Sequence, residues 1–225
     1  MQFGLIEMWE AMGVVAKSVA ILLIGLSIIT LYLFVERQIV FARARSKSKA
    51  IAPKLADLLK AGKIQEALTL SSKKENRGSH LARVTAAAVK EFIEGGEAGL
   101  SFEQQIESAQ RGSDRAHNIF LQELKRGMSV MATVATSSPF IGLFGTIAGI
   151  INAFQGMAMT GSGGIGAVAG GIAEALVTTA FGIGVAIIAL WCFNGLNSKT
   201  EVIGAEMSNA ASEVIDFFVR RQERA

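Results

Sequence analysis

Residues Gly127–Ala173 read GMSVMATVATSSPFIGLFGTIAGIINAFQGMAMTGSGGIGAVAGGIA, a run of 47 residues without a charged side chain. A second uncharged run of 24 residues, Ala175–Ser198, follows Glu174, and a third of 18 residues covers Ser18–Val35. A bilayer core about 30 Å thick needs roughly 20 apolar residues of helix. The two shorter runs therefore predict one transmembrane helix each, and the longest run is too long for a single span.

The longest run has its break at Gly156–Gly171, which contains seven glycines. We expect one span before this glycine-rich loop and the start of the next span near its end. The fold class is then all-α: an integral membrane protein with three transmembrane helices and long cytoplasmic helical extensions. The predicted segments are a periplasmic N-terminal segment (1–13), transmembrane helix 1 (14–35), a cytoplasmic helical region (36–126), transmembrane helix 2 (127–155), a periplasmic Gly-rich loop (156–169), transmembrane helix 3 (170–193) and a cytoplasmic C-terminal helix (194–225).

Basic residues set the expected orientation. Of 22 Lys and Arg residues, 17 lie in Glu36–Arg126 and four in Lys199–Ala225, whereas the opposite side has only Lys17. The positive-inside rule places Glu36–Arg126 and Lys199–Ala225 in the cytoplasm and the N-terminus on the opposite side of the membrane. The sequence pI near 9.1 then reflects topology and contact with anionic lipid, not nucleic-acid binding.

Within the cytoplasmic region, Pro53 predicts the start of a new helix and Gly95–Gly99 predicts a turn. Ser101 and Gln104 have the spacing of a capping box. From Ser101 the pattern favours one helix that runs into the second span, with a kink at Pro139. Lys199–Arg224 has the pattern of a separate amphipathic helix.

No pattern for an enzyme, a cofactor or a metal site is found. His80 and His117 lie far apart without a cysteine or carboxylate at metal-ligand spacing, so both are expected at the surface. The single cysteine, Cys192, excludes an internal disulfide. The glycine-rich Gly161–Gly166 lacks the Lys-Ser/Thr ending of a phosphate-binding loop.

Glu174 is the only charged residue between Arg126 and Lys199. An ionisable group inside a membrane costs a few kcal/mol and normally marks an ion pathway. The structural alternative is a glutamate in the first turn of its helix, stabilised by the helix dipole. Thr178 lies on the same helix face as Glu174, whereas Thr179 is turned away from it. These two threonines and Thr146 could hydrate a pathway, although intramembrane hydroxyls more often bond to a helix backbone.

Small residues form a stripe on the second span at Gly142, Gly145 and Gly149. This spacing favours close helix packing, within one chain or between copies. Because three spans enclose little, an aqueous path requires oligomerisation or a partner.

Two motifs resemble the MotA/TolQ/ExbB proton-channel family. ATSSPFIGLFGTIAGIINAF (135–154) is similar to the family's second-span pattern, and GGIAEALVTTAFGIGVAIIALWCFN (170–194) to its third. The three-span order agrees best with the TolQ/ExbB branch. The sequence departs from the family where Ser138-Pro139 replaces Ala-Pro, and where Gly170-Gly171 and Ile187-Ile188-Ala189 lack the usual prolines.

The resemblance implies a homo-oligomeric ring, a pentamer, around two single-span partners of the TolR/ExbD/MotB type, whose transmembrane aspartate carries the proton. It places Glu174, Thr146 and Thr179 at the family's pore-lining Glu and Thr positions. Thr178 is supported only by its position on the same helix face as Glu174. The implied function is a stator-type motor driven by the proton motive force, in the inner membrane of a bacterium, with the N-terminus in the periplasm and the C-terminus in the cytoplasm. Tol envelope maintenance, TonB-type import and gliding motility stay open as the energised process, as does sodium in place of protons.

A non-conducting membrane scaffold is the alternative from another class. In that reading the small-residue stripes assemble helices and Glu174 anchors a helix end. A solute transporter is disfavoured because the sequence has no internal repeat.

Overall fold

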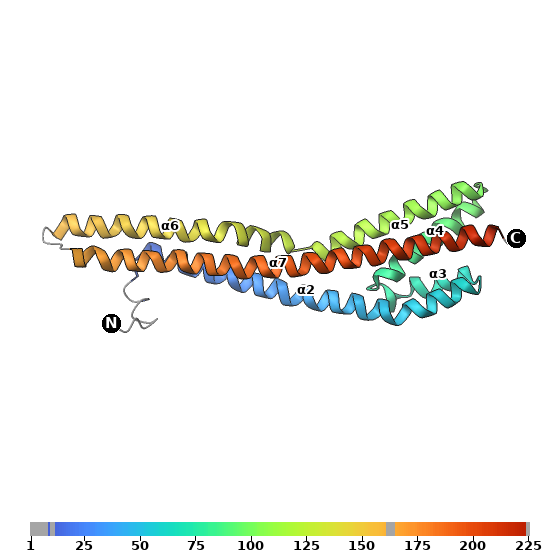
Figure 1. The fold of residues 1–225 in the computed structure, drawn as a ribbon, viewed down its shortest axis with the longest axis horizontal. Helices are drawn as coiled ribbons and strands as arrows, with labels where there is room; N and C mark the ends of the chain where they lie inside the picture. Colours follow the sequence, from blue (N-terminus) through green and yellow to red (C-terminus); the bar gives the residue numbers. More distant parts are fainter. Residues whose placement is uncertain (1–8, 10–11, 161–164, 224–225) are drawn as a thin grey trace. The chain divides into compact units, whose positions relative to one another are not determined.

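The structure, a computed structural model, describes Trp9, Met12–Thr160 and Ile165–Glu223. Within these residues the chain forms six α-helices and one short 3-10 helix and no strand, so the prediction of an all-α fold is confirmed (Figure 1). The elements are α2 (Val14–Lys60), α3 (Ile64–Ser72), η1 (Lys74–Asn76), α4 (His80–Glu97), α5 (Phe102–Lys125), α6 (Met128–Thr160) and α7 (Ile165–Gln222).

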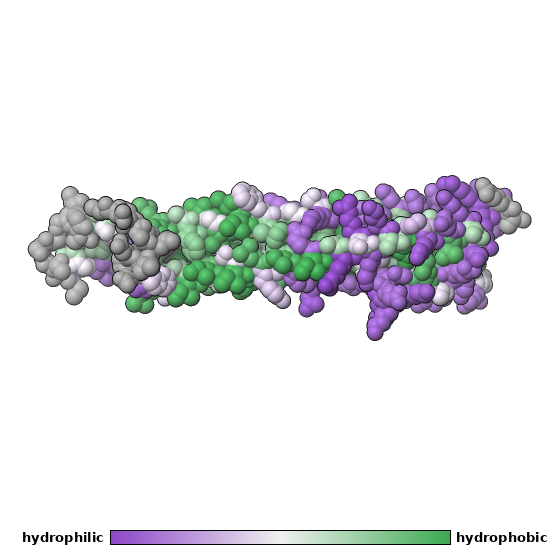
Figure 2. Space-filling model, turned by 90° about the horizontal axis from the view of Figure 1, so that it is seen from below, coloured by the Kyte–Doolittle hydropathy of each residue, from purple (hydrophilic) through white to green (hydrophobic). Residues whose placement is uncertain are grey.

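Three of these helices, α2, α6 and α7, are long and apolar enough to cross a membrane, as the sequence predicted. In the single chain at most 33% of the most apolar window of each helix is buried. Figure 2 shows the resulting surface, on which hydrophobic side chains cover the part of the chain that these windows form. Apolar surface of this extent is stable in lipid or against other protein, not in water.

The chain divides into two compact units. The apolar unit comprises Met1–Val35 and Gly127–Gly195, and the charged unit comprises Glu36–Arg126 and Leu196–Ala225. The helices α2 and α7 each continue from one unit into the other. The boundaries after Val35 and after Arg126 coincide with positions where the sequence changes between uncharged and charged stretches.

The core of the apolar unit joins its three helices. Val19 and Leu23 of α2 are buried together with Val134 of α6 and with Val185 and Ala189 of α7. Because α6 and α7 also approach each other closely, the polar side chains between them are fixed by backbone on both sides.

The charged unit has a separate core in which α4, α5 and the end of α7 meet. Val89 of α4 and Ala109 of α5 are buried against Phe218 of α7. Phe92 stacks on Phe218 with ring centroids 4.0 Å apart. Glu91 joins α4 to α5 through a 2.5 Å ion pair with Arg115. This packing explains why an amphipathic pattern, rather than an apolar one, suffices for these helices.

Two helix boundaries differ from the sequence prediction. Instead of ending before Pro53, α2 continues through it to Lys60, because Ile51 and Leu55 on either side of the proline are buried against α3 and α4. The predicted helix from Ser101 into the second span is broken, since α5 ends at Lys125 and Gly127 has a φ of +79°. A glycine adopts this left-handed conformation without the steric cost that a side chain would bring.

Other segments are longer than predicted. The turn expected at Gly95–Gly99 is helical as far as Glu97, and the chain turns at Gly99, with a φ of +74°. Helix α7 is continuous from Ile165 to Gln222, so the third span and the C-terminal helix are one element. The capping box at the start of α5 is confirmed, with the Gln104 N–H donating to Ser101 Oγ and the Ser101 N–H donating to Gln104 Oε1.

The predicted loop over 156–169 is mostly helical in the described residues. Helix α6 runs to Thr160 and α7 begins at Ile165, while 161–164 lie outside the described residues. Glycine within a helix costs only about 1 kcal/mol relative to alanine, and this segment has no proline, so neighbouring alanine and methionine residues suffice to extend both helices.

Candidate functional site

The site lies between α6 and α7 in the apolar unit, where glycines let the two helices approach. A Cβ atom on Gly142 would lie 2.9 Å from the Thr178 carbonyl oxygen and 3.0 Å from Thr179 Cα. One on Gly149 would lie 3.0 Å from Ala175 Cβ. Contacts of this kind require residues without side chains, so α6 and α7 are packed backbone against backbone.

The third glycine of the stripe, Gly145, also lies against α7. A Cβ atom on Gly145 would lie 2.8 Å from Thr178 Oγ1 and 3.1 Å from Val19 Cγ1, so this glycine faces both α7 and α2. Pro139 lies inside α6, which stays helical on both sides of it. The carbonyl of the preceding Ser138 faces Gly182 of α7, where a Cβ atom would be 2.5 Å away.

Thr146 and Thr179 meet across this interface. Their hydroxyls are in hydrogen-bond contact. Thr146 Oγ1 also donates toward the carbonyls of Gly142, at 3.2 Å, and Ala175, at 3.0 Å. Thr146 is 8% exposed and Thr179 is half-buried. The pair is therefore a polar position held between two apolar helices.

Thr178 has a different environment. It is 1% exposed, and its hydroxyl donates to the Ala175 carbonyl at 2.7 Å and approaches the Gly142 carbonyl at 3.4 Å. Such bonds to helix carbonyls are the ordinary use of an intramembrane threonine. Thr178 thus belongs to the helix contact, whereas Thr179 also retains partial exposure.

Glu174 lies nine residues after the start of α7, so it is not in the first turn of its own helix. Its carboxylate instead reaches the start of α2, where Oε1 accepts a hydrogen bond from the Gly13 N–H at 2.7 Å. The Gly13 carbonyl accepts the first bond of α2, from the Lys17 N–H at 3.0 Å. The carboxylate is therefore at a helix N-terminus, which stabilises negative charge.

These groups follow one another along α7. Glu174 precedes Thr178 by about 6 Å and Thr179 by about 7.5 Å of helix rise. A carboxylate can take up and release a proton, and a hydroxyl can both donate and accept one. The arrangement can thus hold a negative charge near one end of the helix pair and offer a hydroxyl pair farther along.

Sequence reasoning did not find the partner of Glu174. The Gly13 N–H is a backbone group, and only the packing of the start of α2 against α7 brings it to the carboxylate. Two further intramembrane hydroxyls, those of Thr30 and Ser138, are buried and have no hydrogen-bond partner among the described residues. Thr30 could have been noted as a threonine within the first uncharged run.

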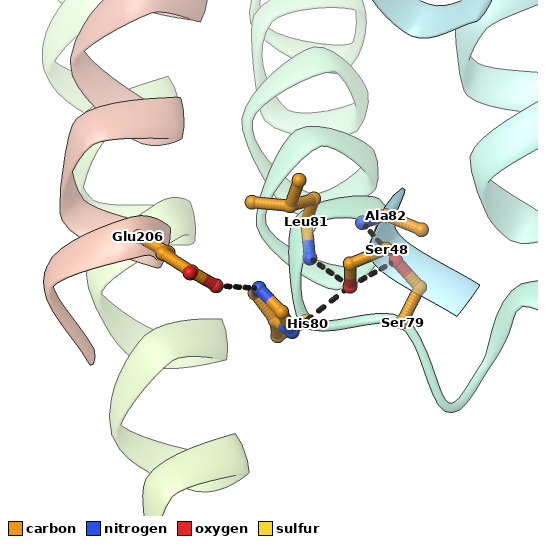
Figure 3. A network of polar contacts seen from close by, with 6 residues as sticks. All are labelled: Ser48, Ser79, His80, Leu81, Ala82 and Glu206. Carbon is orange, nitrogen blue, oxygen red and sulfur yellow. Dashed lines mark hydrogen bonds and ion pairs between the residues drawn. The ribbon is translucent and has the colours of Figure 1, made fainter. Parts of the chain in front are cut away.

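A second polar cluster lies in the charged unit, around His80 (Figure 3). The prediction that His80 is a surface residue is wrong, because its side chain is fully buried. Its Nδ1 atom is 2.9 Å from Ser48 Oγ of α2, and its Nε2 atom is 2.8 Å from Glu206 Oε2 of α7. His117 is half-buried, and its Nε2 atom is shielded from solvent.

Ser48 extends the cluster to the start of α4. Its hydroxyl is 2.8 Å from that of Ser79, which caps α4 by accepting the Ala82 N–H at 3.1 Å. Burial lowers the pKa of His80 below its usual value, and the nearby Glu206 carboxylate opposes this effect only in part. His80 therefore joins α2, α4 and α7 as a neutral imidazole at neutral pH.

Among the described residues no group of three or more His, Cys, Asp or Glu side chains could hold a metal ion.

Comparison with known proteins gives relatives along almost the whole chain. The biopolymer transport protein ExbB of Xanthomonas campestris pv. campestris is 34% identical over 223 residues, covering 94% of this chain and 85% of the relative. ExbB of Neisseria meningitidis is 30% identical over 209 residues, covering 92% and 93%. The Tol-Pal system protein TolQ of Haemophilus influenzae is 27% identical over 216 residues, covering 94% and 92%.

The sequence profile of one family matches residues 76–209, a segment that includes Glu174, the three threonines Thr146, Thr178 and Thr179, and the glycine stripe of α6. The family match and the relatives together cover the three helices that are able to cross a membrane and much of the charged unit. The chain is a membrane protein that belongs to the MotA/TolQ/ExbB proton channel family.

Proposed function

We propose that this chain is the ring-forming subunit of an inner-membrane motor driven by the proton motive force. Copies of the chain, five in the ring, surround single-span partners of the TolR/ExbD type, and proton flow through the assembly does mechanical work on envelope or transport components. The N-terminus lies in the periplasm and the charged unit in the cytoplasm. The family match over 76–209 carries this proposal, since it spans α6 and the proton-pathway residues of α7.

The residue roles follow from the site. Glu174 holds a negative charge at the outer end of α7 and attracts protons arriving from the periplasm. The Thr146–Thr179 hydroxyl pair offers hydrogen bonds to the partner's transmembrane carboxylate. Neutralising that carboxylate changes its preferred contact on the ring, so partner and ring turn relative to each other. A membrane potential of 100 mV supplies about 2.3 kcal/mol per proton for this step.

Gly142, Gly145 and Gly149 support the pathway by packing. These glycines let the backbones of α6 and α7 contact each other directly, so Thr146 and Thr179 stay in contact. Thr178, which is buried among carbonyls, stabilises the same contact and is assigned no direct part in proton transfer.

Proton flux into vesicles that contain this chain and its single-span partner tests the proposal, with Glu174→Gln as the variant. Glutamine keeps a carbonyl oxygen that can accept the Gly13 N–H, so the start of α2 stays anchored while the charge is lost. We expect assembly to be retained and flux to be abolished. An active Glu174→Gln variant would remove Glu174 from the pathway.

One observation favours a second candidate, the structural scaffold. The hydrogen bond from Gly13 to Glu174 is a helix-end anchor, which a non-conducting scaffold also requires. Glu174→Ala removes the anchor and the charge together. A scaffold predicts loss of assembly in Glu174→Ala but normal behaviour in Glu174→Gln, whereas a proton motor predicts loss of flux in both.

A further inference from the structure

A pocket of about 230 Å³ lies in the charged unit, where α2, the turn before α4 and α5 meet. Arg43 and Lys47 of α2 line it together with Arg77 of the turn, and Phe120 and Leu124 of α5 form an apolar side. Three cations beside an apolar surface are the composition expected for a ligand that is anionic at one end.

Among the described residues, the positive charge of the pocket is not balanced. Its one acidic lining residue, Glu123, is already paired with Arg83 at 2.5 Å. The α2 segment from Arg37 to Lys54 contains six Lys and Arg residues and no Asp or Glu. Arg43 and Arg77 are exposed, and in the part of the chain that the structure describes neither side chain forms a hydrogen bond or ion pair.

Lys47 is held in place beside them. Its Nζ donates to the Glu75 carbonyl at 2.6 Å. Its stem passes Gly78, where a Cβ atom would lie 3.4 Å from Lys47 Cδ. The ammonium group is thus fixed against the turn that carries Arg77, and little side-chain freedom remains to be lost on binding.

The pocket also lies near the end of an apolar helix segment. The uncharged run of α2 ends at Val35, and Arg43 follows eight residues later, about 12 Å along the helix. Helical side chains tilt toward the N-terminus, which for α2 is the direction of the apolar run. Ile39, one turn before Arg43 on the same face, is 46% exposed. A lipid headgroup at Arg43 would therefore have apolar surface beside it.

We propose that Arg43, Lys47 and Arg77 bind a phosphate group, that of an anionic phospholipid headgroup. Guanidinium and ammonium groups donate charge-assisted hydrogen bonds to phosphate oxygens, and basic side chains just outside a membrane span attract anionic lipids. The site is separate from the proton pathway and does not depend on the proposed motor function.

The test is native mass spectrometry of the full-length chain in detergent, titrated with phosphatidylglycerol or phosphatidylcholine. The pocket variant is Arg43→Gln with Arg77→Gln. The matched control is Arg45→Gln with Lys49→Gln, which removes the same charge from the same stretch of α2 at two exposed residues that do not line the pocket. A second arm titrates inorganic phosphate alone and follows its ³¹P NMR line width.

We expect wild type and control to retain phosphatidylglycerol in preference to phosphatidylcholine, and the pocket variant to bind it about thirtyfold more weakly, at roughly 1 kcal/mol per basic residue. If wild type and control bind inorganic phosphate, the pocket variant does not, and neither lipid is preferred, the result supports the phosphate site. The ligand is then a soluble phosphate compound. Equal binding by the pocket variant and wild type in both arms, or equal loss in the control, overturns the proposal.

Discussion

Gly142 lies with its α carbon against the backbone of α7. A methyl group there would meet the Thr178 carbonyl and Thr179 Cα at 2.9 and 3.0 Å, and backbone cannot rotate out of the way as a side chain can. We expect Gly142→Ala to lower stability by about 1–3 kcal/mol, the usual cost of overpacking. Gly195→Ala is the control, because nothing lies within 4 Å of a Cβ atom at that helical position. The apparent melting temperature of the full chain in detergent measures both, and an unchanged Gly142→Ala would contradict the close contact.

Thr178 and Thr179 are neighbours with different uses of the hydroxyl. The Thr178 hydroxyl bonds to the Ala175 carbonyl, whereas that of Thr179 contacts Thr146 and is partly exposed. We expect Thr179→Val to reduce proton flux at least tenfold, since valine offers no hydrogen bond. Thr178→Val should cost about 1 kcal/mol of stability and leave flux near wild type. Flux in vesicles with the partner present distinguishes them, and the reverse order of effects would exchange the assigned roles.

Sequence alone identified the candidate residues because charge and glycine are conspicuous in an apolar run. Glu174 is the one charged residue between Arg126 and Lys199, and the glycines recur at helical spacing. The contact between Glu174 and Gly13 could not be predicted. It joins residues 161 positions apart through a backbone group, and every residue type except proline carries such a group.

At the scale of elements, His80 links three helices and makes the charged unit sensitive to pH. Its folded-state pKa is lowered by burial, so below about pH 6.5 the unfolded chain takes up a proton that the folded chain does not. Stability should therefore be constant above that pH and fall as the pH decreases through it, by at most about 1.4 kcal/mol per pH unit. The change should occur above the range in which carboxylates titrate.

Thermal unfolding of the full chain between about pH 5.5 and pH 7.5 measures this slope. Removing the opposing carboxylate with Glu206→Gln should lower the pKa of His80 further and extend the loss of stability to lower pH. His80→Gln should flatten the profile. A wild-type chain that becomes more stable as the pH falls through this range would contradict a neutral, buried His80.

Helix existence was predictable from the sequence, but several helix ends were not. The pattern around Pro53 favours a new start, yet burial of Ile51 and Leu55 outweighs the loss of one backbone hydrogen bond. The α5–α6 break at Gly127 was missed because a single glycine is compatible with a helix as well as with a turn. At Pro53, contacts between distant segments decide between conformations that the local sequence permits.

At the scale of the whole molecule, the apolar unit has more apolar surface than one chain can cover. Five large side chains on one face of α6 recur at spacings of three and four residues and are 51–71% exposed: Phe140, Phe144, Ile147, Ile151 and Phe154. Lipid can cover such a face, and so can another copy. The Thr146–Thr179 pair lies between α6 and α7 of a single chain. Because three spans enclose little, the proposed proton path needs several copies or a partner to enclose it.

A ring in which every copy must contribute Glu174 makes a quantitative prediction for mixed assemblies. If wild-type and Glu174→Gln chains are produced in equal amounts and assemble at random as pentamers, about one ring in thirty contains wild-type chains alone. Flux through vesicles with the partner present should then fall to a few per cent of the wild-type value, well below half. Mixing wild type with Gly195→Ala should leave flux unchanged, because nothing lies within 4 Å of the added Cβ atom. This mixture controls for expression. Flux proportional to the wild-type fraction would show instead that each copy conducts independently, because only then does one defective subunit leave its neighbours unaffected.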